Sequence, residues 1–170
     1  MHTRDLIFPV LLMAWGLSAC AIAPTVPFSD ADFDGFSGRG TATLEGSALG
    51  RTNGGEAKTC AGNIVYLAPA NPYDDQVVGK LALLSAADTF EGPAMKYWPQ
   101  TACDAEGKFV FRNVPAQHWY VLTSIEYQVL GPSPGTTESQ GGLLMRKIAL
   151  SPGDNDVVLT TDDSHIGLPF

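Results

Sequence analysis

Hydrophobic and polar residues alternate along two stretches in the second half of the chain. Between Lys108 and Val114, two phenylalanines fall on one side and mostly polar residues on the other. From His118 to Gln128, odd-numbered positions again place large apolar or aromatic side chains on one face. Such alternation is typical of β-strands with one buried face. Together with a shorter apolar run at residues 64–67, it predicts a core made of Val65, Leu67, Phe109, Phe111, Trp119, Val121 and Ile125.

Turn-forming residues divide the rest of the chain into short segments. Further strands are expected at Thr41–Leu49, Leu143–Leu150 and Asp156–Thr160, and a single short helix at Gly79–Ala87. Gly131–Gly142, with two prolines and four glycines, is expected to be a loop. The chain has 18 glycines, 12 prolines and only 16% charged residues, a composition unfavourable for exposed helices. The pattern predicts an all-β sandwich of about seven to eight strands with at most one short helix.

A longer motif supports the same fold. Residues 104–116 combine an acidic turn with glycine, Phe-x-Phe, and Asn-hydrophobic-Pro. This order resembles the signature of carboxypeptidase regulatory-like domains. The resemblance implies a transthyretin-like (prealbumin-like) sandwich, related in architecture to immunoglobulin-like domains, which serves as a binding or stabilising module. Gln117 stands where that family has glycine and Trp119 where it has tyrosine. The catalytic and metal-binding residues of carboxypeptidases lie outside this module, so the resemblance implies no activity.

The amino-terminal region has the order of a secretory signal peptide, with an early charge followed by an apolar run of about 12 residues. Leu17-Ser18-Ala19-Cys20 resembles the lipobox of bacterial lipoproteins, which implies lipidation of Cys20 and cleavage before it. An ordinary cleaved signal or an uncleaved anchor is the alternative, although the apolar run is shorter than the roughly 20 residues that span a bilayer. The resemblance, with Ala21 after the cysteine, implies an outer-membrane lipoprotein whose domain faces the periplasm.

These features predict a division of the chain into four parts. Residues 1–19 would be the signal peptide, and residues 20–39 a lipidated amino terminus and flexible acidic tether. Residues 40–161 would form the sandwich, and residues 162–170 a carboxy-terminal tail. With Cys20 lipidated, Cys60 and Cys103 remain as an even pair in an oxidising compartment. We therefore expect a structural disulfide between them, since no C-x-x-C motif or adjacent histidine suggests a reactive or metal-binding role.

Charge and motifs narrow the candidate chemistry. A net charge of −8 without a basic cluster argues against nucleic-acid binding and against docking on anionic headgroups. Asp30, Asp32 and Asp34 match the first half of an EF-hand calcium loop, but Thr41 stands where that loop needs glutamate. The three aspartates therefore make only a weak calcium candidate beside their interpretation as part of an acidic tether. No cofactor and no metal site is otherwise predicted.

Catalytic signals are sparse. Asp162, Asp163 and His165 could contribute to a small metal-assisted hydrolase, but neighbouring residues rarely converge as catalytic groups do. A solvated tail is the simpler interpretation. His118 is expected at the surface. The sequence contains none of the common nucleophile, zinc-peptidase or phosphate-loop motifs.

Aromatic residues provide the main binding candidates. Tyr97 and Trp98 precede Cys103, and Tyr120 is expected on the outer face of its strand. They could bind an envelope glycan or protein, or Tyr97 and Trp98 could cap the open end of the sandwich. The chain is interpreted as a lipid-anchored, non-catalytic binding or scaffolding module. An alternative is a periplasmic inhibitor that presents the loop at residues 131–142 to a partner.

Overall fold

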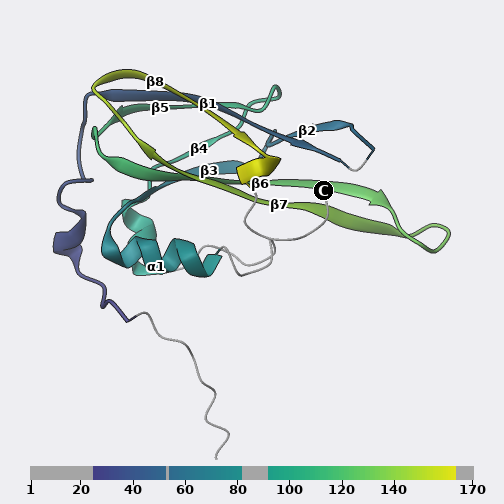
Figure 1. Cartoon of the computed structure of the whole chain (residues 1–170), viewed down its shortest axis with the longest axis horizontal. Coiled ribbons are helices and arrows are strands. Elements are labelled where there is room, and N and C mark those ends of the chain that lie inside the picture. Colours follow the sequence, from purple (N-terminus) through teal and green to yellow (C-terminus); the bar gives the residue numbers. More distant parts are fainter. Residues whose placement is uncertain (1–24, 53, 82–91, 164–170) are drawn as a thin grey trace, which may run out of the picture.

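The computed structural model describes residues 25–52, 54–81 and 92–163 of the 170-residue chain. The described residues form a β-sandwich of two four-stranded sheets with one short α-helix (Figure 1). The strands are β1 (Ala42–Arg51), β2 (Ala57–Thr59), β3 (Ile64–Pro69), β4 (Gln100–Ala102), β5 (Lys108–Val114), β6 (His118–Leu130), β7 (Thr137–Ala149) and β8 (Gly153–Thr160). The helices are α1 (Pro72–Leu81) and the 3-10 turns η1 (Asp30–Phe33), η2 (Pro93–Tyr97) and η3 (Thr161–Asp163). The predicted fold class is confirmed.

The two sheets differ in the direction in which neighbouring strands pair. In the first sheet, β1 pairs antiparallel with β2 and β5 and parallel with β8. The second sheet has the order β4-β3-β6-β7 and is antiparallel throughout. Within it, β6 and β7 form the longest ladder, from His118 opposite Ala149 to Leu130 opposite Thr137. β4 and β5 each have a strand partner on one edge only in the described part of the chain.

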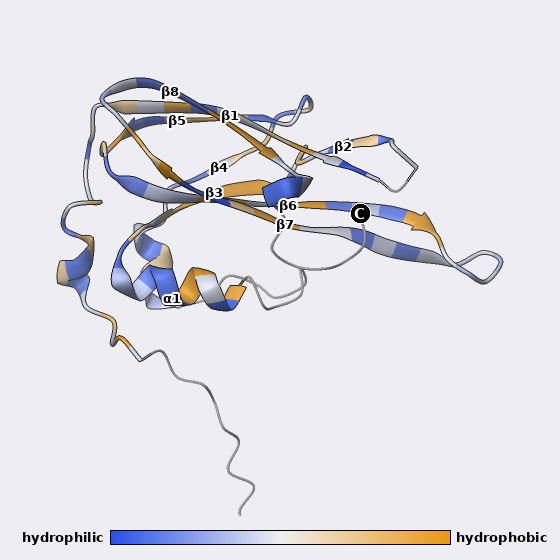
Figure 2. Cartoon of the chain, in the orientation of Figure 1, coloured by the Kyte–Doolittle hydropathy of each residue, from blue (hydrophilic) through white to orange (hydrophobic). Residues whose placement is uncertain are grey.

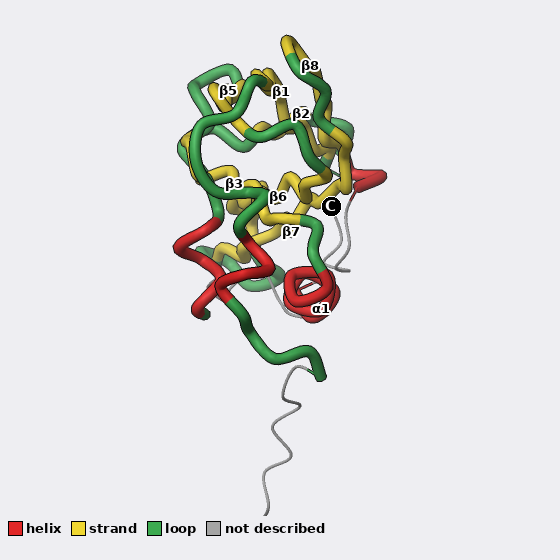
Figure 3. The backbone as a smooth tube through the Cα atoms, turned by 90° about the vertical axis from the view of Figure 1, so that its left-hand side faces the viewer, coloured by secondary structure: helices red, strands yellow, loops and turns green. Residues whose placement is uncertain are grey.

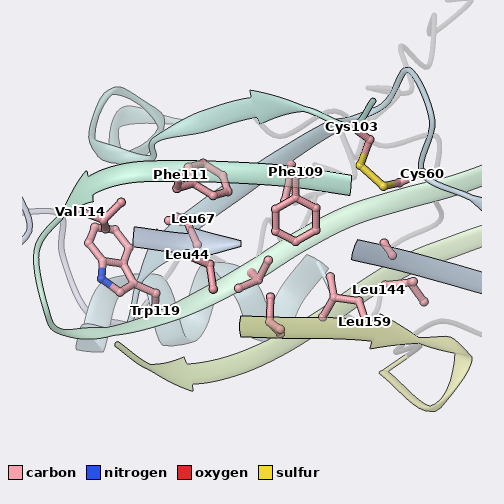
Figure 4. Close-up of a cluster of buried hydrophobic side chains, with 14 of the residues drawn as sticks. Leu44, Cys60, Leu67, Cys103, Phe109, Phe111, Val114, Trp119, Leu144 and Leu159 are labelled. Carbon is pink, nitrogen blue, oxygen red and sulfur yellow. A yellow bond between two sulfur atoms is a disulfide. The ribbon is translucent and has the colours of Figure 1, made fainter. Parts of the chain in front are cut away.

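The main core fills the space between the sheets (Figure 4). All seven residues predicted from the alternation are buried there: Val65, Leu67, Phe109, Phe111, Trp119, Val121 and Ile125. The Phe109 and Phe111 rings meet edge to face, with centroids 6.1 Å apart. The predicted Cys60–Cys103 disulfide is confirmed, with its Cα atoms 5.8 Å apart. It ties the segment before β3 to the end of β4.

A third layer covers the outer face of the second sheet. Figure 3 shows α1, η1 and η2 below β3, β6 and β7, on the side away from β1 and β8. A second apolar cluster lies there, and it includes Phe33, Tyr73, Val78, Trp98, Leu122, Leu143 and Met145. The part of the second sheet that lies over this layer is therefore buried on both faces, and its strand β3 is among the most hydrophobic in the molecule (Figure 2). No helix among the described residues is long and apolar enough to cross a membrane.

The helix starts earlier than the sequence pattern suggested. It begins at Pro72, because the Asn71 side chain accepts a hydrogen bond from the Asp74 backbone N–H at 2.7 Å and proline suits the first helical position. The predicted helix at Gly79–Ala87 overlaps this helix only at residues 79–81, and residues 82–87 lie outside the described part. Asn71 followed by Pro72 is a recognised start signal for a helix, and it lies eight residues before the predicted start.

The predicted loop at Gly131–Gly142 is wrong. β6 continues to Leu130 and β7 begins at Thr137, so only residues 131–136 form the turn of a long hairpin. The ladder continues because Tyr127 keeps one face buried, with the Lys58 Nζ atom 5.6 Å from its ring centre. The hairpin extends beyond the rest of the sandwich (Figure 1).

The expectation of a flexible tether at residues 20–39 does not hold for its described part. Phe33 is fully buried in the second cluster, where its ring stacks on Tyr97 with centroids 4.3 Å apart. The Thr25 backbone N–H donates to the Gln76 side chain of α1 at 2.7 Å. The segment from Thr25 onward is therefore part of the folded domain, because its apolar side chains cover the outer face of the second sheet.

Candidate functional site

An open cleft of about 650 Å³ lies beside the edges of the two sheets. Three segments line it: residues 36–38 before β1, residues 96–101 from η2 into β4, and residues 110–115 from β5 into the following turn. Its volume is within the range of small-ligand sites in proteins. It is the best candidate for a functional site in the described part of the chain.

Strand edges give this cleft backbone hydrogen-bonding groups. Lys108 exchanges hydrogen bonds with Asp104 on the side of β5 away from β1. The backbone N–H and C=O groups of successive residues point to opposite sides of a strand. The N–H and C=O of Val110, two residues after Lys108, therefore also point away from β1. On β4, Pro99 and Thr101 face β3, so the backbone groups of Gln100 point to the opposite side. Two sheet edges therefore supply donors and acceptors at fixed positions.

The first wall comes from the segment between η1 and β1. Phe36 is half-buried and meets the Trp119 ring edge to face, with centroids 5.1 Å apart. The segment is held to β5 by a hydrogen bond from the Gly40 N–H to the Asn113 carbonyl at 2.7 Å. A Cβ atom at Gly40 would lie 2.1 Å from the Val114 backbone, so only glycine allows this approach. An aromatic ring is thereby fixed beside the cleft.

The second wall contains Tyr97 and Trp98. Trp98 is only 5% exposed, and its indole Nε1 donates to the Asp74 carboxylate of α1 at 3.3 Å. The Tyr97 ring stacks on Phe33, and its hydroxyl donates to Asp30. Both rings are therefore held mainly by the helical layer, and only part of each is available to a ligand.

An ion pair joins this wall to the amino-terminal segment. The Lys96 ammonium lies 2.7 Å from the Asp30 carboxylate. The hydrogen bonds from Lys96 and Tyr97 lower the pKa of Asp30, and the bond to Asp30 raises the pKa of both partners. The positive charge of Lys96 is thus largely balanced by Asp30.

The third wall is a bulge at the end of β5. Arg112 and Asn113 together oppose the single residue Thr43 of β1, as the register shift between the strands shows. Asn113 has a φ of +58°, the left-handed region that asparagine tolerates better than most residues. Both side chains are exposed, and neither forms a hydrogen bond or ion pair with another described residue. The bulge therefore leaves a guanidinium and an amide without partners on two consecutive residues that line the cleft.

The sequence-predicted binding surface is only partly assembled. Tyr97 and Trp98 line the cleft, but Trp98 is buried and so is not an exposed platform. Tyr120 lies on the outer face of the second sheet, as expected, but belongs to the helical layer and not to the cleft. Its hydroxyl donates to Asp75 at 2.6 Å; burial and then this bond raise the pKa of Tyr120. The alternative interpretation, in which Tyr97 and Trp98 form a cap, agrees better with their packing. They cover the face of the second sheet and not the end of the sandwich.

The metal and tail candidates that the structure describes do not form a metal site. Among the described residues, no group of three or more His, Cys, Asp or Glu side chains could hold a metal ion. Asp30, one of the three calcium candidates with Asp32 and Asp34, is bound to Lys96. Asp163 is buried and forms a bidentate ion pair with Arg146, at 2.6 and 2.7 Å. His165 and Cys20 lie outside the described residues.

Sequence reasoning missed three residues of the cleft: Phe36, Arg112 and Asn113. Phe36 was assigned to the tether, and the other two were interpreted only as part of a fold motif. Asn113 carried a usable signal, because asparagine is frequent in turns and tolerates the left-handed backbone conformation that it adopts here. The convergence of the three segments depends on contacts far apart in the sequence and had no local signal.

Comparison with known proteins gives a fold but no family. No protein-family model matches this chain, and no curated protein matches it. The structure is similar to the crystal structure of PA1324 from Pseudomonas aeruginosa, which is described as a proposed carbohydrate binding protein. The TM-score is 0.66 and the sequence identity 20%, over 78% of this chain and 97% of that chain. At this identity the similarity concerns the fold alone.

Proposed function

We propose that this chain is a lipid-anchored, non-catalytic carbohydrate-binding module of the bacterial cell envelope. The cleft between the sheet edges is its binding site. The observation that carries this proposal is the combination of an aromatic ring at Phe36, free side-chain donors at Arg112 and Asn113, and strand-edge backbone groups at Val110 and Gln100.

This combination suits the chemistry of sugars. A pyranose ring has hydroxyl groups around its rim, which need donors and acceptors at fixed positions, and apolar C–H faces, which pack on aromatic rings. Backbone groups at a sheet edge cost little entropy to use because the strands already hold them in place. The similarity in fold to PA1324, itself a proposed carbohydrate binder, agrees with this function. The Leu17–Cys20 motif supports the lipid anchor and the envelope location.

Two alternative functions have lost their main supporting observation. The inhibitor hypothesis relied on an adaptable loop at residues 131–142, but residues 137–142 belong to strand β7 and only residues 131–136 form a turn. The hydrolase hypothesis relied on Asp162, Asp163 and His165, but the Asp163 carboxylate is already paired with Arg146. A binding function needs no activated nucleophile or general base, so it does not depend on Asp162, Asp163 or His165.

A bulky side chain in the cleft tests the proposal. Gln100 is exposed on β4 and lines the cleft, so Gln100→Trp should fill part of the site and abolish binding to envelope glycans. Gln128→Trp makes the same change at an exposed strand position on the hairpin and should bind normally. Binding of the purified full chain to an array of bacterial envelope oligosaccharides is the measurement. If the unaltered chain binds no glycan, the proposed function is wrong. If both variants bind equally well, the cleft is not the binding site.

A further inference from the structure

The cleft differs in charge from the rest of the chain. The sequence has 18 acidic and 10 basic residues, for a net charge of −8. The residues that line the cleft nevertheless include two cations, Lys96 and Arg112, and no aspartate or glutamate. Resting on the proposed function, we propose that the ligand is an acidic glycan, and that Arg112 binds the carboxylate of one of its uronic acid units.

Arg112 is the cation best suited to this role. Its guanidinium presents paired N–H groups that match the two oxygens of a carboxylate. Arg146 shows the same chemistry within this chain, where both Asp163 oxygens accept a hydrogen bond. Arg112 is exposed and has no such partner among the described residues, so a ligand carboxylate can take that place.

Lys96 contributes less to ligand selection. Its ammonium is bound to Asp30, and it also lies 4.9 Å from the centre of the Tyr97 ring. A ligand carboxylate would have to compete with Asp30 for this charge. Asp30 therefore largely balances the charge of Lys96, and Arg112 is the cation of the cleft that has no acidic partner among the described residues.

The groups around Arg112 favour a sugar over an acidic peptide. Asn113 lies next to Arg112 on the bulge, and its amide can bind hydroxyl groups adjacent to the carboxylate. Phe36 offers a ring for the apolar face of the sugar. The cleft thus pairs one carboxylate-binding group with an amide, backbone edges and an aromatic surface. A glutamate-rich peptide would instead need several cations in a row.

Matched acidic and neutral oligosaccharides test this inference. The full chain would be titrated calorimetrically with oligomers of galacturonate, glucuronate and mannuronate, and with their carboxyl methyl esters, which keep the sugar and remove the charge. At least one acidic oligomer should bind about tenfold or more tightly than its ester, since a hydrogen-bonded charge pair contributes that much. The preference should weaken as salt is added, because the carboxylate site is open to solvent.

Single substitutions test whether Arg112 is responsible for the preference for the acidic oligomer over its ester. Arg112→Gln should remove it while leaving ester binding unchanged, and Arg112→Lys should restore only part of it because lysine lacks the planar fork. Lys108→Gln removes the same charge from the same strand outside the cleft and should keep the preference. Thermal unfolding of each variant shows that the fold is intact.

The possible outcomes distinguish failure of this inference from failure of the proposed carbohydrate-binding function. Equal binding of acid and ester, or equal loss of the preference in Arg112→Gln and Lys108→Gln, overturns the inference and leaves the carbohydrate-binding function standing. Binding of neutral sugars alone has the same meaning. Binding of a polyglutamate peptide with no binding of any oligosaccharide, acidic or neutral, overturns both.

Discussion

Asp74 shows how a single buried group joins the helical layer to the wall of the cleft. It is fully buried near the start of α1, where its Oδ2 atom accepts a hydrogen bond from the Trp98 indole. Its Oδ1 atom has no partner among the described residues. Burial raises the pKa of this carboxyl to about 7, against an ordinary value of 3.8. The folded protein therefore holds a proton on Asp74 at pH values where the unfolded chain has released it.

Asp74 should make the stability of the protein depend on pH. Because the pKa is higher in the folded state, the free energy of unfolding should fall as the pH rises from about 4 to about 7 and then level off. At about 1.4 kcal/mol for each pKa unit, the fall is at most about 4 kcal/mol. Asp74→Asn should remove this fall and be more stable than the unaltered chain at pH 8.

Urea unfolding at pH 5 and pH 8 is the appropriate measurement. Asp156→Asn, at an exposed position of β8, makes the same chemical change and should keep the pH dependence. An unchanged pH dependence in Asp74→Asn would show that Asp74 ionises normally in the folded state.

Packing between the elements depends on where side chains are absent as well as present. β1 lies in the middle of the first sheet, and a Cβ atom at its Gly46 would lie 2.4 Å from the Phe109 ring and 2.8 Å from Val157. On α1, the space around Gly79 is open. Gly46 is therefore required by close packing of the core, whereas Gly79 is not required by any contact.

The two glycines should respond in opposite ways to the same substitution. Gly46→Ala should lower the free energy of unfolding by about 1–3 kcal/mol, because the added methyl group overpacks the core. Gly79→Ala should raise it by about 0.5–1 kcal/mol, because alanine is the better helix former. Chemical denaturation of both variants gives the comparison. Stabilisation by Gly46→Ala would mean that the Phe109 ring moves aside freely.

At the scale of the whole molecule, the docked amino-terminal segment limits how the domain can sit on a membrane. Thr25 is bound to Gln76 on α1, only five residues after Cys20. Five residues span roughly 17 Å when fully extended. If Cys20 carries the lipid, as proposed, the helical layer must lie close to the bilayer, with the first sheet on the far side (Figure 3).

Lipid attachment and orientation can be measured together. Cys20→Ala should leave the protein in the soluble fraction or as unprocessed precursor, because the lipid acceptor is lost. In vesicles containing the purified lipoprotein, a fluorophore at residue 79 on α1 should be quenched more strongly by headgroup-linked quenchers than one at residue 154 on β8. A Cys20→Ala protein that is still acylated would disprove the anchor, and equal quenching at both positions would disprove the orientation.

The sandwich and its core could be predicted from the amino-acid sequence. Alternation between buried and exposed positions is a local property of strands, so the core faces of β3, β5 and β6 could be assigned without any knowledge of their neighbours. The disulfide could be predicted because only two cysteines remain besides Cys20, the proposed lipid acceptor. Both depend on residue type and spacing alone.

Tertiary structure decided the helical layer, the length of the hairpin and the cleft. Leu122, Leu143 and Met145 make the outer face of the second sheet apolar. Phe33, which the sequence placed in a flexible tether, packs into the apolar cluster on this face. The cleft joins residues 36–38, 96–101 and 110–115, which meet only through strand pairing and packing over long sequence separations. Whether the Arg112 guanidinium has an acidic partner, and whether the Trp98 ring is buried, depends on which side chains lie nearby in space. Sequence spacing does not record those neighbours, so the site could be recognised only in the folded molecule.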